Sequence, residues 1–289
     1  MMPHSRPGPD QETTVVPGEP LIAFKDVHIG FDDGDVLRGI SFDVLPGETK
    51  VLLGESGSGK TLIMKLAAGL IRPDAGRIWA MGHELGEMSE TELLDFRRHL
   101  GFVFQEGALF DSLTVGENVA FRLREEKVAE QEIQSRVNEA LRFVELDAVV
   151  EKYPAELSGG MRRRVSIARA LVNHPRVVFY DSPTAGLDPV TSQTIINLIL
   201  RGRDSQSVTS LLATHRVQDA FGLASFRLDP ATGRVVRAAE NGERTNRGQE
   251  TPATNVLVLR AGQIYFEGPA DELLHSPDEY LKKFLASAG

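Results

Sequence analysis

Cysteine is absent from this sequence of 289 residues, which excludes disulfides and metal sites built from thiolates. A chain without cysteine suits a reducing compartment. Aromatic residues are sparse at 7%, with a single tryptophan, but a hydrophobic share of 41% is ordinary for a globular protein with a core. No apolar run approaches the about 18 residues that are needed to cross a bilayer. The sequence therefore predicts a globular chain without a transmembrane segment.

Positive charge is also scarce. The net charge is -9, from 32 Lys and Arg against 41 Asp and Glu, which argues against a protein that binds nucleic acid in bulk. The N-terminal stretch MMPHSRPGPDQETTVVPGEP has no apolar segment of the kind that signal peptides carry. Its proline, glycine and polar content predicts a disordered lead over residues 1–20.

Strand and helix patterns alternate along most of the chain. Residues 21–53 alternate apolar and polar positions as strands do, and residues 59–70 have a helical pattern. Helical periodicity extends from about 114 to 155, and the apolar runs VVFYD and SLLAT indicate strands separated by a helix. This order predicts an α/β fold with a parallel sheet. Residues 229–254 are polar and without period, which predicts a flexible insertion.

The stretch GESGSGKT fits the phosphate-loop pattern G-x-x-x-x-G-K-[ST] at every fixed position. Glycines let several backbone N–H groups point at one phosphate, Lys60 supplies charge for the β- and γ-phosphates, and the Thr61 hydroxyl can ligate Mg²⁺. The strand-like TKVLLG before it and the helical KTLIMKLAAGL after it favour this interpretation over a chance glycine-rich turn. The candidate ATP-binding residues of this loop are Gly54, Glu55, Ser56, Gly57, Ser58, Gly59, Lys60 and Thr61.

A second motif, ELSGGMRRRVSIARAL, begins at residue 156. Ser158 is a suitable N-cap, and Gly159 and Gly160 leave bare N–H groups at the helix start, which is a second place for an anion. Taken alone, the motif is no more than a capped helix. Together with GESGSGKT, VFYDSPTAGLDP and ATH, in this order, it resembles the ATP-binding subunit of ABC transporters. The resemblance covers residues 21–285.

The resemblance implies an architecture and partners. It implies an ABC-type P-loop NTPase domain over residues 21–289, with an antiparallel β subdomain and an inserted helical subdomain over about 107–172. In this family two subunits pair head to tail, so that the phosphate loop of one and the signature motif of the other hold the same ATP. We therefore expect an ATP hydrolase that works as a homodimer with ATP and Mg²⁺. The permease would be a separate membrane chain, and this protein would lie peripherally on the cytoplasmic face of the inner membrane.

The resemblance also implies roles for single residues. Phe31 matches the aromatic residue that stacks on adenine, although a strand residue in the core is the alternative. Gln105 matches the Q-loop glutamine, which contacts Mg²⁺ and the attacking water. Asp181 matches the Walker B aspartate that holds Mg²⁺, and Asp188 matches the D-loop. His215 matches the switch histidine at the γ-phosphate, where a structural histidine is the alternative.

Ser182 departs from the family pattern, because most relatives carry a glutamate after the Walker B aspartate as the general base. A serine hydroxyl cannot take a proton at neutral pH, and a positioned base is typically worth about 10²–10⁴ in rate. Phosphoryl transfer depends mainly on positioning and charge stabilisation, so Gln105 and His215 could still orient water for slow hydrolysis. The intact TAGLDP that follows argues against general decay of the site.

The stretch QEGALFDSLTVGENVA, followed by LSGGMRRR, resembles the ATPases of Mce-associated, Mla-like lipid transport systems. These systems move phospholipids or related lipids between envelope membranes, with an Mce-type (mammalian-cell-entry) protein as a further partner. Leu109 and Phe110 are expected to dock the permease, since exposed apolar patches tend to be interfaces, whereas packing in the helical subdomain is the alternative. Two other functions remain open. One is an ABC ATPase that serves no permease, and the other is an ATP-binding regulator with very slow turnover.

Overall fold

The computed structural model describes residues 19–32, 34–238 and 254–287. Nearly all of the predicted disordered lead therefore lies outside the described residues. The central sheet has the order β12-β11-β3-β8-β7-β6 and consists of β12 (Gln263–Pro269), β11 (Thr254–Arg260), β3 (Thr49–Gly54), β8 (Thr209–Thr214), β7 (Val177–Asp181) and β6 (Leu100–Val103). A four-stranded sheet has the order β2-β1-β4-β5 and consists of β2 (Gly34–Val44), β1 (Ile22–Phe31), β4 (Ala75–Ala80) and β5 (His83–Glu84).

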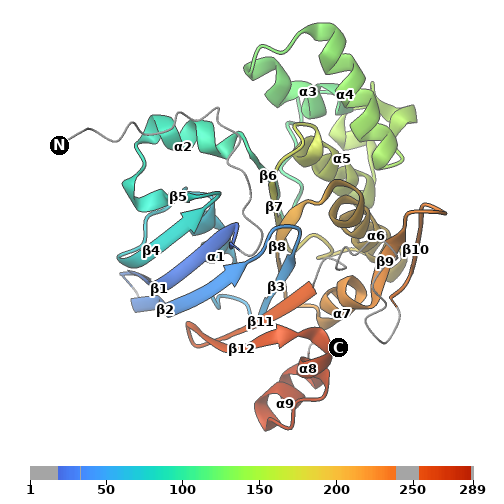
Figure 1. The fold of residues 1–289 in the computed structure, drawn as a ribbon. Coiled ribbons are helices and arrows are strands. Elements are labelled where there is room, and N and C mark those ends of the chain that lie inside the picture. The colour runs from blue at the N-terminus through green and yellow to red at the C-terminus, as the bar shows by residue number, and fades with distance from the viewer. Residues whose placement is uncertain (1–18, 33, 239–253, 288–289) are drawn as a thin grey trace.

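Helices cover these sheets (Figure 1). They are α1 (Lys60–Ala67), α2 (Glu90–Arg97), α3 (Val115–Glu125), α4 (Glu130–Phe143), α5 (Gly159–Leu171), α6 (Pro189–Gln206), α7 (Val217–Ser225), α8 (Ala270–Leu274) and α9 (Glu279–Ser287), with short 3₁₀ turns η1 (Leu85–Glu87), η2 (Asp147–Val149) and η3 (Pro154–Glu156). Five strands of the central sheet are parallel, and β12 pairs with β11 antiparallel at one edge. All pairings of the four-stranded sheet are antiparallel. The predicted α/β fold with an antiparallel β subdomain is thus confirmed.

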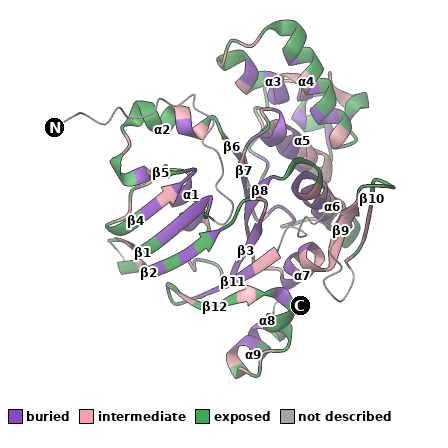
Figure 2. Ribbon diagram, in the orientation of Figure 1, coloured by how far each residue is buried: buried purple, intermediate pink, exposed green. Residues whose placement is uncertain are grey.

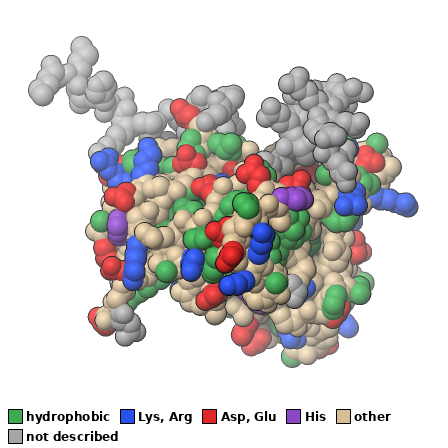
Figure 3. Space-filling model, turned by 90° about the horizontal axis from the view of Figure 1, so that it is seen from below, with side chains coloured by type: hydrophobic (Ala, Val, Ile, Leu, Met, Phe, Trp, Pro, Cys, Tyr) green, Lys and Arg blue, Asp and Glu red, His purple; other side chains and the backbone are tan. Residues whose placement is uncertain are grey.

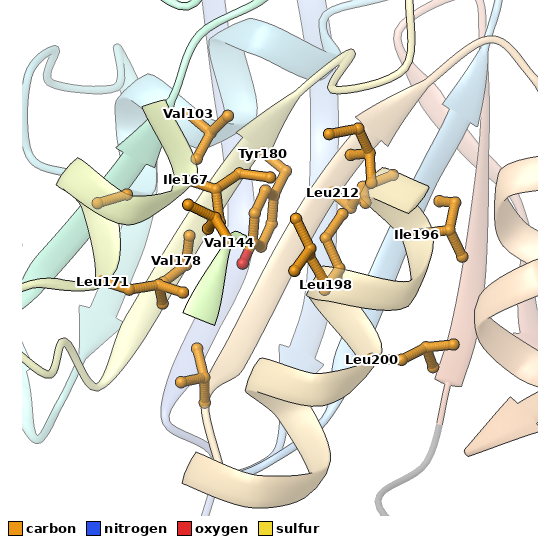
Figure 4. Close-up of a cluster of buried hydrophobic side chains, with 14 of the residues drawn as sticks. Val103, Val144, Ile167, Leu171, Val178, Tyr180, Ile196, Leu198, Leu200 and Leu212 are labelled. Carbon is orange, nitrogen blue, oxygen red and sulfur yellow. The ribbon is translucent and has the colours of Figure 1, made fainter. Parts of the chain in front are cut away.

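The inner strands β3 and β8 of the central sheet are buried on both faces, which is why each contains an apolar run (Figure 2). Side chains of a strand alternate between the two faces, and so does their packing. In β3, Leu52 packs in a cluster with α1, α2 and the antiparallel sheet, whereas Val51 and Leu53 pack in a cluster with helices α3 to α9. Figure 4 shows part of the second cluster, where Tyr180 of β7 lies near Ile167 of α5. The two clusters fix the ends of the parallel strands, where the candidate site lies.

The helices α3, α4 and α5 lie together at the top of Figure 1. Capping boxes start α2 at Ser89 and α3 at Thr114, and the hydroxyl of Ser158 caps α5 by accepting from the Met161 N–H. Buried side chains of all three helices join the same cluster as those of α6 and β7. The limits of a separate helical subdomain, about 107–172, remain a prediction.

The segment 229–254 differs from the expectation of a flexible insertion. β9 (Phe226–Asp229) and β10 (Arg234–Arg237) form an antiparallel hairpin that packs beside α6, and β11 already begins at Thr254. Asp229 fixes the turn, because its carboxylate accepts from the Ala231 N–H and the Thr232 hydroxyl. The expectation was therefore wrong for residues 229–237, where Asp-Pro and Thr-Gly were hairpin-turn signals. Residues 239–253 lie outside the described part of the chain.

Two further features concern the surface charge and the apolar character of the helices. Acidic and basic side chains are interspersed among the described residues on the face shown in Figure 3. In the part of the chain that the structure describes, every helix falls short of the length and apolar character that a membrane span requires.

Candidate functional site

The phosphate loop connects the end of β3 to the start of α1. Gly54 has φ +153, and a Cβ there would come 2.8 Å from the carbonyl oxygen of Leu259 on the neighbouring strand. Gly59, which caps α1, has φ +99, and its Cβ would meet the Leu37 side chain at 2.6 Å. Both positions need glycine for backbone conformation and for space. The predicted loop residues thus form a turn whose N–H groups precede a helix start.

The Lys60 side chain folds back onto the phosphate loop. Its ammonium donates to the carbonyl oxygens of Gly54 and Glu55, both at 2.8 Å, and to the Ser58 hydroxyl at 3.2 Å. Burial lowers the pKa of Lys60, and the carboxylates of Asp181 and Glu55 partly oppose this by attraction. The loop therefore holds a desolvated cation whose charge a polyphosphate would stabilise.

Thr61 and Asp181 meet because β3 and β7 both flank β8 and end at the same edge of the parallel sheet. The Thr61 hydroxyl donates to the Asp181 carboxylate at 2.9 Å, across 120 residues of sequence. A hydroxyl and a carboxylate are oxygen ligands of the kind that Mg²⁺ takes beside phosphate oxygens. The sequence predicted each residue separately, and the fold places them in contact.

An open cleft of about 510 Å³ collects most of the predicted site. Residues 56–61 line it together with Phe31, Gln105, Asp181, Ser182 and His215. Phe31 is 57% exposed at the end of β1, so the alternative of a core residue is wrong. An exposed aromatic ring, a phosphate loop and the carboxylate of Asp181 on one cleft are features that a nucleotide site requires. The Gln105 and His215 side chains are both exposed there.

Ser182 follows Asp181 with its backbone in the left-handed region, at φ +47. Its N–H donates to the Ala213 carbonyl at 2.8 Å, which fixes the residue beside the end of β8. No described residue accepts from or donates to its hydroxyl within hydrogen-bond distance. The side chain is thus free to meet water or substrate, but it lines the cleft without a carboxylate.

The signature motif lies apart from this cleft. Ser158, Gly159 and Gly160 start α5 and do not line the cavity, and Asp188 caps α6 through the N–H groups of Val190 and Thr191. The two helix starts adjoin, because a Cβ on Gly160 would meet the Thr191 side chain at 2.4 Å. The chain therefore presents two anion-binding features on separate surfaces.

Two buried polar residues near the cleft escaped the sequence interpretation. Asp219 of α7 is 2% exposed and accepts from the hydroxyls of Thr184 and Thr214, at 2.6 and 2.7 Å. It thereby ties the segment after Ser182 to the strand that precedes His215. Arg163 of α5 is 6% exposed and donates to the Phe104 carbonyl, next to Gln105. For Asp219, a charged residue among the apolar residues of a helix was the available signal, whereas Arg163 stands in a run of three arginines that gave none.

Leu109 and Phe110 were expected either to dock a permease or to pack in the helical subdomain, and the two residues differ in this respect. Leu109 packs against the core cluster, whereas Phe110 is exposed and its ring lies 4.5 Å from that of Phe121, another exposed aromatic residue. Asn118 fixes this turn, because its amide accepts from the Phe110 N–H and donates to the Phe110 carbonyl. Phe110 and Phe121 thus form an apolar pair on the surface beside the segment that carries Gln105.

Comparisons with known proteins place the chain in a family. A family model described as ABC transporter matches residues 37–185. The chain is 40% identical over 270 residues to the chloroplastic protein TRIGALACTOSYLDIACYLGLYCEROL 3 of Arabidopsis thaliana, covering 86% of this chain and 75% of the relative. It is 36% identical over 239 residues to a probable sulfate/thiosulfate import ATP-binding protein CysA of Chlorella vulgaris, covering 83% of this chain and 99% of the relative.

Solved structures agree with this. A dimeric ATP-binding cassette, solved in a post-hydrolysis state with ADP and Pi, superposes with a TM-score of 0.70 at 26% identity, covering 86% of this chain and 98% of the other. The motifs, the fold and the relatives therefore lead to one conclusion: the chain belongs to the ABC transporter family, as an ATP-binding domain that hydrolyses ATP.

Proposed function

We propose that this chain powers a lipid transporter of the bacterial envelope, as the ATPase that binds a separate membrane permease. The observation that carries the proposal is the segment after Gln105, where Phe110 forms an exposed apolar pair with Phe121 of α3. Such a pair is suited to receive an apolar helix of a partner. The protein would lie on the cytoplasmic face of the inner membrane, and an Mce-type protein would receive or deliver the lipid.

The names of relatives bear on the cargo. The Arabidopsis relative is named after trigalactosyldiacylglycerol, a glycolipid, whereas the Chlorella relative is named for sulfate and thiosulfate import. The lipid assignment is supported by the first name and by the QEGALF segment. Because the Chlorella relative is named for sulfate and thiosulfate import, a transport test must also distinguish the import of these oxyanions.

We infer the following roles within the cleft. Phe31 would stack on the base, and the phosphate loop with Lys60 would hold the β- and γ-phosphates. Thr61 and Asp181 fit Mg²⁺, because their oxygens already lie 2.9 Å apart, and Gln105 lines the same cleft. Phosphate oxygens and water would supply further ligands. Bound Mg²⁺ would neutralise charge on the phosphates.

Hydrolysis at this site would depend on positioning more than on proton abstraction. Gln105 and His215, both exposed to the cleft, would orient the attacking water, and Ser182 would offer only a neutral hydroxyl. Lys60 would stabilise charge on the transferred phosphoryl group. Because the residue directly after Asp181 is Ser182 and not a carboxylate, we infer slow turnover.

The transport assignment can be tested by reconstitution. The tagged chain is purified from membranes with its permease, reconstituted into phospholipid vesicles, and supplied with ATP. We expect ATP-dependent transfer of a fluorescent phospholipid to acceptor vesicles, and loss of the permease from the Phe110→Ala variant. Leu94→Ala is the matched control, because Leu94 is also an exposed apolar residue but lies on α2. ATP hydrolysis stimulated by sulfate and indifferent to lipid, or a chain that purifies without a permease, would contradict the proposal.

We also propose that ATP closes a head-to-tail homodimer. The signature residues lie apart from the cleft of their own chain, and the related cassette was solved as a dimer. Ser158→Arg should weaken the dimer by about tenfold or more, because a large side chain would be forced into a packed interface.

Light scattering with and without ATP–Mg²⁺, on the permease complex and on the isolated chain, measures this. Ser89→Arg is the control, because Ser89 caps α2 as Ser158 caps α5, so both variants lose an N-cap worth about 1 kcal/mol. Equal closure of the Ser158→Arg complex and wild type would exclude the signature role.

A further inference from the structure

Arg163 is a buried cation that has no part in the roles inferred above for the nucleotide cleft. It lies on α5, five residues after Ser158, and 94% of its surface is removed from solvent, since its exposed fraction is 6%. Its guanidinium donates to the carbonyl oxygen of Phe104, the residue directly before Gln105. Charged side chains are seldom buried to this extent without a partner, so the arrangement calls for a physical reason.

Two carboxylates attract Arg163, one in the candidate site and one next to Gln105. It forms no ion pair with any residue in the described ranges, and the carboxylates that attract it are Asp181 and Glu106. Burial lowers the pKa of Arg163, and these two carboxylates oppose the shift. The guanidinium remains charged, as arginine does in proteins. Arg163 therefore donates a hydrogen bond to the backbone next to Gln105 and is attracted by the carboxylate of Asp181.

The loop of residues 104–108 rests on the same face of α5. Arg169, six residues further along the helix, donates to the carbonyls of Gly107 at 2.9 Å and Ala108 at 2.7 Å. Gly107 has φ +80 and lies over the helix, with its would-be Cβ 3.5 Å from the Arg162 carbonyl. The loop is thus attached to α5 at both ends through arginine donors.

We propose that Arg163 is a positioning residue that fixes Gln105 in the cleft by holding the Phe104 carbonyl, and so makes the position of Gln105 follow α5. Ser158 is the N-cap of α5, and Arg163 lies only about 7.5 Å further along the helix axis at 1.5 Å per residue. When the start of α5 binds the ATP of a partner subunit, α5 shifts as a rigid helix. The Arg163 guanidinium then moves with it. Gln105 then moves with the signature end of the same chain. This inference rests on the proposed role of Gln105.

A purely structural role would have different consequences. Arg163→Met keeps length and apolar volume but removes the donor and the charge, and replacing a buried charge by a well-packed apolar side chain is often neutral for stability. If Arg163 only packed, kcat would follow the folded fraction. If it positions Gln105, kcat falls while the folded protein and its ATP affinity persist, since neither Arg163 nor Phe104 lines the cleft.

The experiment is a double-mutant cycle on the full chain in its permease complex. Steady-state phosphate release gives kcat and KM for wild type, Arg163→Met, Gln105→Ala and the double variant. We expect Arg163→Met to lower kcat about tenfold, the effect of one charge-assisted hydrogen bond, with KM changed less than about twofold. The double variant should match Gln105→Ala alone, because the arginine acts through the glutamine. Arg163→Lys, which retains a cationic donor, should recover part of kcat and replaces the Met variant if that one does not fold.

Arg164→Met is the matched control, because Arg164 belongs to the same helix but donates to the Val144 and Glu145 carbonyls, away from the loop. An equal loss of kcat in Arg164→Met, or additive losses in the double variant, would overturn the role of Arg163 alone. A Gln105→Ala variant with the kcat of wild type would instead refute the proposed role of Gln105, and the inference with it.

Discussion

Ser182→Glu should raise kcat for ATP hydrolysis, by as much as about 10²–10⁴ if the new carboxylate is well placed. Ser182 lines the cleft directly after Asp181, and its hydroxyl cannot act as a base at neutral pH. Its backbone has φ +47, and serine and glutamate both carry a Cβ, so the substitution adds no new backbone strain of the left-handed kind. KM should hardly change, because a base acts in the transition state and not in ground-state binding. Phosphate release by the permease complex measures both constants.

The matched control is Ser182→Gln, which has the shape of glutamate without a proton acceptor of comparable basicity. It should leave kcat near that of wild type, and Ser182→Ala should do the same if the hydroxyl takes no part. A marked loss in Ser182→Ala would instead mean that the serine itself orients water. If wild type hydrolyses ATP at the rate usual for ABC ATPases and Ser182→Glu does not raise kcat, Ser182 does not limit hydrolysis. His215 would then be the first candidate for the general base. Persistent near-zero turnover in Ser182→Glu would favour an ATP-binding regulator.

Local patterns were sufficient where one stretch of chain determines both shape and chemistry. The phosphate loop is of this kind, because glycines that permit left-handed φ angles, a strand before and a helix after are all local in sequence. The parallel sheet was also predictable, since strands that are buried on both faces carry apolar runs, as residues 51–53 of β3 and 211–213 of β8 do. Ser158 as an N-cap follows the same logic.

Contacts between distant segments were not predictable in this way. The hydrogen bond between Thr61 and Asp181 depends on β3 and β7 flanking β8, an order that local periodicity does not contain. Arg163 would be assigned from sequence to a solvated run of three arginines, and only the packing of residues 104–108 on α5 shows that it is buried. The β9–β10 hairpin was missed because its strands are only four residues long and half-exposed, so polar composition outweighed its turn signals.

Lys60→Ala should abolish measurable binding of a fluorescent ATP analogue. The ammonium is held by the carbonyls of Gly54 and Glu55 at the floor of the loop, so it is ordered before nucleotide arrives. Two charge-assisted hydrogen bonds to phosphate oxygens are worth about 3–6 kcal/mol, which corresponds to about 10²–10⁴ in affinity. Because burial lowers the pKa of Lys60, wild-type affinity should also fall as pH rises through that lowered pKa and the ammonium is lost.

A matched substitution separates this effect from a general loss of positive charge. Lys283→Ala on α9 removes one exposed cation that does not line the cleft, and it should bind the analogue as wild type does. Lys60→Ala should remain folded, because the loop conformation depends on its glycines and on the strand and helix that flank it. Fluorescence titration at several pH values, with circular dichroism as a check of folding, decides the matter. Undiminished affinity in a folded Lys60→Ala variant would mean that the backbone N–H groups and the start of α1 hold the phosphates without the lysine, and the phosphate loop would then be an anion site of helix and backbone alone.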